Sequence, residues 1–571
     1  MSPSMLNVLT RLALPLLLLS ACAAPSAAIR SPETSSDQRG AVSSADPRAS
    51  EAGREILRAG GSAADAAIAM MLALTVVEPQ SSGIGGGGFF VHHDAGSGEF
   101  ETYDGRETAP AAATPTYFFE NGEPMSRSEA VPGGKSVGVP GNLRMMALVH
   151  EEQGKLPWAK LFEPAIRLAR DGFAITPRLH NSLARSGHIA SPWARGQFFD
   201  ANGAPKPVGT MLKNPELASL LDALAAHGAD HFYVGPPAQD LVQTVRTASH
   251  NPSPMTLGDL ATYDAKERAP VCGMYREYRI CGMGPPSSGG TTVFAILKQL
   301  EGFDLSALGK NNPVAWHLIA ESMRLAYADR EAYQADADYV DVPVGGLIDP
   351  GYLSERARLI LPEGSIPHVT AGHPPGARPM PAVADGEVPS TSHMVAADGE
   401  GNVANVTSTI EGAFGSGLTS NGYFLNNELT DFTIVPEVDG RPVGNRVEGG
   451  KRPRSSMAPT IVYGPDGEIR IAIGAAGGVT IIAQVAKALI GVIDWKLTAQ
   501  EAIALPQIIG MGDRVSVEQG SWLEAMIPEL AALGLKPIAR PAGFKANAIE
   551  WTPNGWRGAA DPRSEGVALK E

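Results

Sequence analysis

Cysteine, positive charge and long apolar runs are all scarce in this sequence of 571 residues. It contains 3 Cys, and 46 Lys and Arg against 61 Asp and Glu give a formal net charge of −15. Nucleic acid would be repelled by this charge, so a nucleic-acid partner is excluded. The 12 His form neither an H-E-x-x-H motif nor a Cys/His cluster, so we expect no metal ion and no other cofactor.

Two glycine-rich stretches fail as nucleotide sites. In "SSGIGGGGFFVHHD", Gly83, Gly85 and Gly88 have the dinucleotide spacing. A helix is predicted before them and a strand after them, which is the reverse of what that motif requires. In "VPGGKS", Glu129 stands where a phosphate loop has its first glycine. The sequence therefore predicts no nucleotide site.

The N-terminal stretch is typical of an export signal. One basic residue, Arg11, precedes an apolar run over 12–19 that is too short to cross a membrane. Residues 1–21 are therefore predicted to be a signal peptide. The letters "LSAC" resemble a lipobox, in which Cys22 is lipidated, and cleavage by an ordinary signal peptidase is the alternative. The Ala-, Ser- and Pro-rich residues 22–48 predict a flexible tether.

These features predict an exported protein, either periplasmic or anchored to the cell envelope. Any attachment to a membrane would run through a lipid at Cys22 alone. The other two cysteines, Cys272 and Cys281, lie in "VCGMYREYRICGM". A hairpin centred between Arg276 and Glu277 would place their sulfurs opposite each other. A disulfide suits an oxidising compartment, and a pair of free, half-buried thiols is the alternative.

The remaining chain is long enough for several domains or for one large layered domain. Residues 50–78 predict two helices separated by a Gly-Gly break, and residues 140–265 have mostly helical patterns. From residue 391 strands and turns dominate, with a helix predicted over "TIIAQVAKALIGVID". The sequence thus predicts an α+β protein with a helix-rich first part and a strand-rich last third.

A cluster of hydroxyl residues marks the boundary between these two parts. Ser390, Thr391 and Ser392 immediately precede a predicted strand. A threonine hydroxyl becomes a good nucleophile when a base is beside it, and the α-amine of an N-terminal threonine can be that base. Thr391 would gain a free amine only if the chain cuts itself between Ser390 and Thr391. A turn that caps the strand is the alternative interpretation.

Nine separated motifs favour the first interpretation. In order and spacing they resemble the γ-glutamyltranspeptidase (glutathione hydrolase) family, a resemblance that extends from about residue 50 to 565. Before the boundary they are "GGSAADAAIAMMLALTVVEPQSSGIGGGGFF", "YDGRETAP", "VGVPG" and "PPSSGG". After it they are "TSHMVAADGEGNVANVTSTIEGAFGSGL", "GYFLNNELTDF", "KRPRSSMAPTIV", "GAAGG" and "DPRS".

The resemblance implies an N-terminal-nucleophile hydrolase with a four-layer αββα sandwich. It implies that the precursor cuts itself into a large subunit, 49–390, and a small catalytic subunit, 391–571, which stay together as a heterodimer. The implied reaction passes a γ-glutamyl group from glutathione or another γ-glutamyl compound to Thr391. Water, an amino acid or a peptide would then accept it.

Further site residues follow from matching motif positions. By resemblance, the Thr409 hydroxyl assists Thr391, and the backbone N–H groups of Gly477 and Gly478 stabilise the oxyanion, helped by a helix that begins after them. Ser455 and Ser456 would join Arg106 in holding the substrate α-carboxylate. The α-ammonium would be held by Glu411, Glu428 and Asp431. Many relatives have amides at two of these three positions, so an unusually acidic pocket is expected.

Two departures from the family pattern bear on specificity. Ser392 replaces a threonine, which leaves the nucleophile intact. The segment between Asp431 and Ser455 is short, which predicts a reduced lid over the site and favours hydrolysis over transpeptidation. A cephalosporin or glutaryl acylase of the same superfamily is therefore the first alternative. A catalytically silent envelope lipoprotein that retains the fold is the second.

Overall fold

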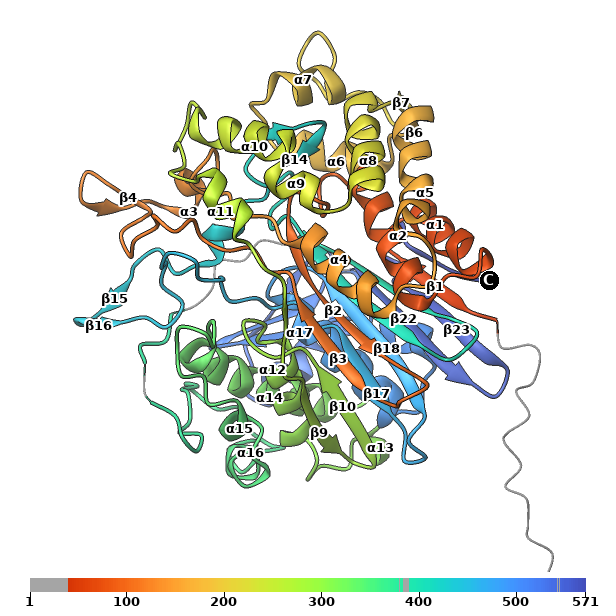
Figure 1. Ribbon diagram of the computed structural model, residues 1–571. Coiled ribbons are helices and arrows are strands. Elements are labelled where there is room, and N and C mark those ends of the chain that lie inside the picture. Colours follow the sequence, from red (N-terminus) through yellow and green to blue (C-terminus); the bar gives the residue numbers. More distant parts are fainter. Residues whose placement is uncertain (1–38, 379, 384–389, 542, 544) are drawn as a thin grey trace, which may run out of the picture. The chain divides into compact units, whose positions relative to one another are not determined.

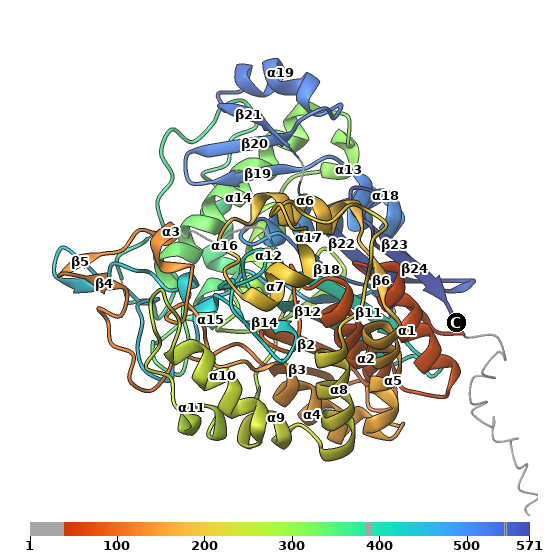
Figure 2. The same ribbon diagram turned by 90° about the horizontal axis from the view of Figure 1, so that it is seen from above.

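The computed structural model describes residues 39–571 except 379, 384–389, 542 and 544. The expected signal peptide, Cys22 and most of the expected tether lie outside these residues. In the described part, two antiparallel sheets are stacked face to face, and helices cover the outer face of each (Figures 1 and 2). The four-layer αββα arrangement is therefore confirmed.

The first sheet has seven strands, and its order mixes strands from before and after residue 391. Along the sheet the strands are β24 (Val567–Lys570), β1 (Ala41–Ser44), β11 (Ser392–Ala397), β12 (Val403–Thr409), β2 (Gly87–His93), β3 (Phe100–Asp104) and β8 (Lys266–Glu267). Side chains of β11 alternate between two cores, because successive residues of a strand point to opposite faces. Met394 and Ala396 pack toward the helices, whereas Val395 and Ala397 pack toward the second sheet.

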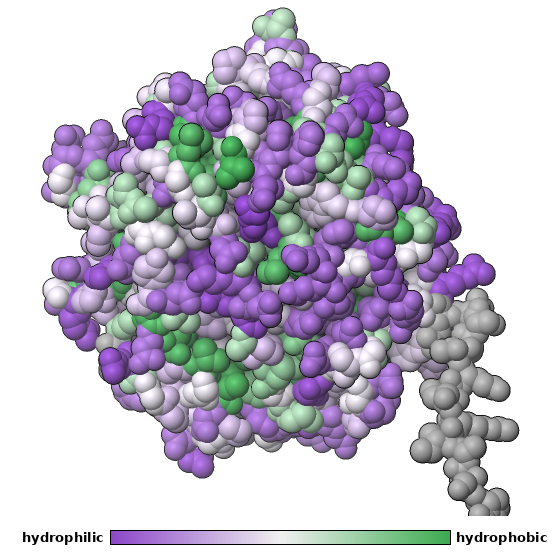
Figure 3. Space-filling view, in the orientation of Figure 1, coloured by the Kyte–Doolittle hydropathy of each residue, from purple (hydrophilic) through white to green (hydrophobic). Residues whose placement is uncertain are grey.

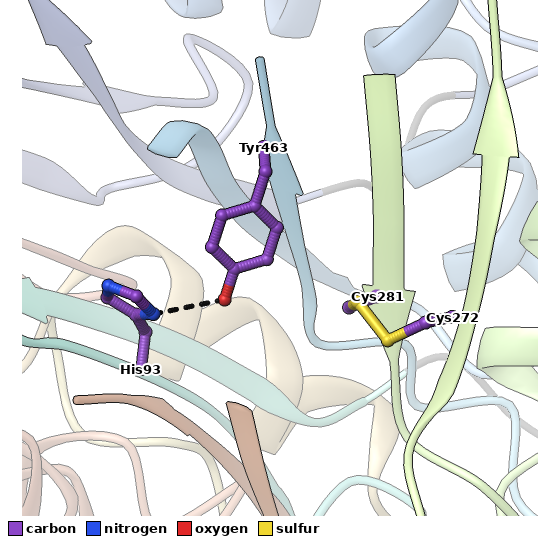
Figure 4. The surroundings of a disulfide bond; sticks show 4 residues. All are labelled: His93, Cys272, Cys281 and Tyr463. Carbon is purple, nitrogen blue, oxygen red and sulfur yellow. Dashed lines mark hydrogen bonds between the residues drawn. A yellow bond between two sulfur atoms is a disulfide. The ribbon is translucent and has the colours of Figure 1, made fainter. Parts of the chain in front are cut away.

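The second sheet has six strands. Along the sheet they are β23 (Gly555–Ala560), β22 (Lys545–Thr552), β18 (Ile469–Ala476), β17 (Thr460–Tyr463), β10 (Tyr278–Gly282) and β9 (Val271–Tyr275). Several hydrogen bonds join the two sheets. In one of them the Tyr463 hydroxyl of β17 lies 3.1 Å from Nδ1 of His93 in β2 (Figure 4), and in others Asn405 of β12 donates to the carbonyls of Thr460 and Ile473.

Helices on the two outer faces complete the layers. Those on the first sheet include α1 (Pro47–Arg58), α2 (Ala63–Val77), α4 (Asn142–Gln153) and α5 (Trp158–Asp171). Those on the second sheet include α12 (Gly289–Gln299), α17 (Thr480–Ile493) and α18 (Ala499–Ala504). Every residue of α2 is buried, which explains its apolar sequence. Among the described helices, none is both long enough and apolar enough to cross a membrane.

The predicted helices over residues 140–265 and the break after α1 are confirmed. Beyond α5 the structure has α6 (Pro177–Arg185), α7 (Pro192–Phe198), α8 (Pro215–His227), α9 (Asp230–Val234), α10 (Pro236–Arg246) and α11 (Leu257–Ala261). After α12, the long α14 (Pro313–Tyr333) packs against a small sheet of β19 (Ile508–Met511), β20 (Arg514–Glu518) and β21 (Pro537–Arg540).

The expected tether is wrong at its C-terminal end. Residues 41–44 form β1, which pairs with β11 on one side and β24 on the other, and residue 47 already begins α1. The sequence did not indicate this strand, because it consists mostly of Ala and Ser. Small side chains fit between two neighbouring strands and under a helix, whereas sequence patterns of strands depend on larger apolar residues.

Cys272 and Cys281 lie opposite each other on β9 and β10 and form a disulfide bond (Figure 4). The hairpin between them turns at Arg276, which has a φ of +54°. Both the predicted hairpin and the bridged interpretation of the two cysteines are therefore confirmed in the structure.

The face seen in Figure 3 is mostly hydrophilic, with small, separated hydrophobic patches. Single exposed apolar side chains of this kind are ordinary on a folded protein and mark no large apolar interface on this face.

Candidate active site

Thr391 lies buried at the start of β11, in the middle of the first sheet. Its φ is +83°, in the left-handed region that a β-branched residue rarely adopts. Such a conformation costs on the order of 1–3 kcal/mol and persists only where the surroundings impose it. The backbone is therefore strained at the residue that follows the predicted cleavage point.

The Thr391 hydroxyl donates a hydrogen bond to Oγ1 of Thr409 over 3.1 Å. Strands β11 and β12 pair with Ser392 opposite Ser408, which brings the two threonines together at the next position. The backbone N–H of Glu411 also donates to Thr409 Oγ1, over 2.8 Å. The predicted partnership between the two threonine hydroxyls is thus present in the structure.

The residues on both sides of Thr391 are anchored to the segment that follows α2. The Ser390 hydroxyl donates to the carbonyl of Gln80 over 2.9 Å, and the Ser392 hydroxyl donates to the Glu78 carboxylate. This carboxylate also accepts a hydrogen bond of 2.7 Å from the buried Lys545 ammonium of β22. Anchors on both sides account for the strained backbone between them.

Burial shifts the pKa values of Lys545 and Glu78, the charged pair of this anchor. It lowers the pKa of Lys545 to about 8, although Glu78 opposes that shift. Burial would also raise the pKa of Glu78, but Lys545 and Arg178 outweigh it and hold that pKa below its usual value. The pair is therefore charged at neutral pH, and each partner depends on the other.

Gly477 and Gly478 connect β18 to α17, and the predicted helix after them is confirmed. Their φ values are +139° and +58°, which glycine adopts at little cost. Within the described part of the chain, neither glycine N–H donates a hydrogen bond. Gly478 lines the same cavity as Thr391. Two unused donors near a helix N-terminus are suited to a developing negative charge.

Arg106 is buried and already bound by protein groups. Its guanidinium pairs with the carboxylates of Glu428 and, over 2.7 Å, Asp431. It also donates to the carbonyls of Pro453 and Arg454. Glu428 and Asp431 come from a single 3-10 turn, η1 (Glu428–Asp431). A substrate carboxylate would therefore have to share Arg106 with this turn.

The pocket is less acidic than expected, because Arg127 of the short helix α3 (Arg127–Ala130) reaches it. The Arg127 guanidinium pairs with Glu411 and, over 3.4 Å, with Asp431. Arg127 belongs to none of the motifs quoted above and lies 284 residues from Glu411 in the sequence. Nothing in the sequence therefore indicated this contact. Three carboxylates now face two guanidinium groups.

A second residue that was not predicted is Glu107, which is buried with its carboxylate 3.9 Å from the Arg106 guanidinium. Burial raises the pKa of Glu107 to about 7. Burial also raises the pKa of Glu428 well above its usual value, and repulsion from Glu107, Asp431 and Glu411 adds to that shift although Arg106 opposes it. Glu107 directly follows Arg106 in "YDGRETAP", which was the available signal.

The two predicted serines lie where two motifs meet. The Ser288 hydroxyl of "PPSSGG" donates to the carbonyl of Ser455, and Arg330 of α14 donates to the Ser456 hydroxyl over 2.6 Å. Arg330 was not predicted to take part. The contact explains why these two motifs occur together: one supports the backbone of the other.

The structure gathers nearly all of the predicted site residues around one cavity. Only Ser390 and Gly477 are missing from its lining, and both adjoin a residue that is present. The cavity measures about 20 Å³, on the scale of one water molecule. Its lining comprises Arg106, Thr391, Thr409, Glu411, Glu428, Asp431, Ser455, Ser456, Met457, Gly478 and Ile481.

His393, to which the sequence assigned no role, is a packing residue. Its Nδ1 lies 2.9 Å from the Thr407 hydroxyl, and burial lowers its pKa to about 3. It is therefore uncharged at neutral pH. In the part of the chain that the structure describes, no three His, Cys, Asp or Glu side chains are grouped so that they could hold a metal ion.

Comparisons with known proteins agree with this site. Residues 49–570 match the family described as Gamma-glutamyltranspeptidase. The glutathione hydrolase proenzyme of Bacillus subtilis (strain 168) is 35% identical over 543 residues, which are 93% of this chain and 91% of that protein. The acylase ACY 1 proenzyme of Pseudomonas sp. (strain SE83) is also 35% identical, over 94% of each chain.

A solved structure, the cephalosporin acylase from Bacillus halodurans, superposes with a TM-score of 0.82 at 26% identity. It covers 93% of this chain and 96% of that one. Hydrolase and acylase relatives are thus equally similar in sequence, so the choice between their substrates depends on the pocket itself.

Proposed function

The chain belongs to the γ-glutamyltranspeptidase family, and from this we propose that it is a glutathione hydrolase made as a proenzyme. It would cut itself before Thr391 and then transfer γ-glutamyl groups to water or to amines. The observation that carries the proposal is the shared cavity, in which a hydroxyl pair, an unused N–H donor and a charged cluster meet.

Self-cleavage would begin with attack of Thr391 Oγ1 on the carbonyl carbon of Ser390. The new C–O bond replaces the C–N peptide bond, and the hydroxyl proton ends on the Thr391 nitrogen. Water then hydrolyses this ester and releases a Ser390 carboxylate and a free Thr391 amine. The fragments would stay together, because β1 of the large fragment pairs with both β11 and β24 of the small one.

The same groups of Thr391 would catalyse γ-glutamyl transfer. The free amine of Thr391 takes the proton from Oγ1, which attacks the γ-carbonyl of the substrate. The N–H groups of Gly477 and Gly478 would stabilise the oxyanion. The leaving amine takes the proton, and water or an acceptor amine then attacks the γ-glutamyl ester and regenerates Thr391.

The anchor at Glu78 is expected to promote self-cleavage by maintaining the strain at Thr391. Lys545→Met removes its cation and loosens the hold on Ser392. If the strain is worth about 1–3 kcal/mol, its loss slows cleavage by roughly 5- to 150-fold. The rate is read by intact mass of the freshly made chain over time. Lys536→Met, at an exposed lysine, is the matched control, and equal cleavage rates in both variants would contradict this role.

The substrate class is tested with two anilides that differ only in the α-amino group, γ-glutamyl-p-nitroanilide and glutaryl-p-nitroanilide. Charge-assisted hydrogen bonds to the ammonium are each worth about 1.5–3 kcal/mol. We therefore expect a kcat/KM at least tenfold higher for the γ-glutamyl compound. Preference for the glutaryl compound would instead identify an acylase, a candidate that the neutralisation of Glu411 by Arg127 favours.

The preference for the ammonium should increase with pH. Burial raises the pKa of Glu107 to about 7, so this carboxyl group loses its proton as the pH rises from 6 to 8. More negative charge then faces the ammonium, while the glutaryl compound gains nothing. We expect the ratio of the two kcat/KM values to rise over this range, and Glu107→Gln to reduce the rise. A ratio independent of pH would contradict the assignment.

We also propose export, with the predicted signal at residues 1–21 and the disulfide between Cys272 and Cys281 as support.

We further propose that water is the main acceptor of the γ-glutamyl group. The short segment after Asp431 contains only the small hairpin of β15 (Glu437–Val438) and β16 (Arg441–Pro442), which supports the expected reduced lid over the site.

A further inference from the structure

A second and larger cavity, of about 600 Å³, adjoins the bond between Ser390 and Thr391. Ser390 lines this cavity, whereas Thr391 lines the small one described above. Glu411 lines both. The bond that the chain is proposed to cut therefore runs between the two cavities, with the acyl-binding pocket on the Thr391 side.

One wall of the larger cavity is helix α6. Arg178, Asn181, Ser182 and Arg185 all line it, and their spacing of three and four residues places them on one face of the helix. Arg185 is exposed and, within the described residues, its side chain makes no hydrogen bond or ion pair. This face therefore presents a guanidinium whose five donors are available to a ligand.

The side chains that line the cavity carry more positive than negative charge, because Arg178, Arg185 and Arg563 face a single carboxylate, Glu411. The Arg178 guanidinium pairs with Glu78 at 3.3 Å, but Glu78 also neutralises Lys545. The Glu565 carboxylate accepts a hydrogen bond of 2.9 Å from the Arg178 backbone N–H. Glu411, which also lines the cavity, is paired with Arg127. Glu78 is thus shared by Arg178 and Lys545, and in the described part of the chain no carboxylate pairs with Arg185.

Two further basic side chains at the cavity add little. Arg563 is held by Glu518 and Asp561, which offset its charge. Burial lowers the pKa of His188, so its ring is neutral at neutral pH. The excess positive charge therefore lies on the α6 wall.

We infer that this cavity receives the leaving group, and the incoming acceptor, through a carboxylate bound by Arg185 with help from Arg178. The inference rests on the proposed function. With the acyl group in the Thr391 pocket, the amine part of the substrate extends toward Ser390 and the larger cavity. When this part is an amino acid or a short peptide it ends in a carboxylate, which a guanidinium binds with two parallel hydrogen bonds.

The test uses γ-glutamyl-p-nitroanilide and γ-glutamyl-3-carboxy-4-nitroanilide, whose leaving groups differ by one carboxylate. For Arg185→Gln we expect kcat/KM to fall about tenfold for the carboxylated compound and to stay within twofold for the other. Arg58→Gln is the matched control, because Arg58 is likewise an exposed arginine that ends a helix, α1. It should change neither value. Intact mass confirms that every variant is cut to the same extent.

The outcomes separate this inference from the function on which it rests. If the wild-type protein hydrolyses neither anilide, the proposed function is wrong and the inference is wrong with it. If the wild-type protein hydrolyses both, but Arg185→Gln alters the two kcat/KM values equally or not at all, the function stands and the leaving-group site is wrong.

Discussion

Thr391→Ala is expected to leave a single uncut chain with no detectable γ-glutamyl transfer. The variant lacks the oxygen that would attack the Ser390 carbonyl and later the substrate. It should also fold nearly as well as the wild type, because the loss amounts to one hydrogen bond to Thr409, worth about 1 kcal/mol. Intact mass and N-terminal sequencing would show one chain, without the fragment that begins Thr-Ser-His-Met.

Thr391→Ser is the matched control, since it keeps the hydroxyl and removes only a methyl group. We expect it to be cut and to hydrolyse the γ-glutamyl anilide, more slowly than the wild type. A Thr391→Ala protein that is processed and active would refute the assignment of the nucleophile. A wild-type chain that is never cut would instead favour a silent protein that retains the fold.

The polar centre of the site could be predicted because each member lies in a motif with its own local signal. Thr391 precedes a strand and Gly477 and Gly478 precede a helix, as the structure confirms. Their convergence was implied only by resemblance to a family. The register that places Ser392 opposite Ser408 has no counterpart in sequence spacing, because a strand pairing depends on both strands at once.

The contacts that were not predicted join distant segments through single long side chains. Arg127 and Glu411 are 284 residues apart, and Lys545 and Glu78 are 467 residues apart. The residues next to an arginine or a lysine in the sequence do not indicate whether its charged group contacts water or a buried carboxylate. An acidic pocket was therefore expected from the three carboxylates alone. The structure shows that this expectation is wrong, because the Arg127 guanidinium also lies at the pocket.

Arg106→Met is expected to lower both stability and activity by large amounts. The change leaves the buried carboxylates of Glu428 and Asp431 without their main cation, and breaking one side of a buried ion pair costs about 3–5 kcal/mol. The thermal midpoint should fall clearly, and hydrolysis of the γ-glutamyl anilide should be lost. Unchanged stability would contradict the pairing of Arg106 with these two carboxylates.

Comparison with the double variant Arg106→Met/Glu428→Gln separates the two roles of Arg106. Glu428→Gln removes one of the stranded charges at nearly constant volume, so the double variant should be more stable than Arg106→Met alone. Activity should not return, because the substrate carboxylate still lacks its guanidinium. If activity returned with stability, Arg106 would serve only to hold the η1 turn, and the carboxylate would have to be bound by Ser455, Ser456 and the backbone around them.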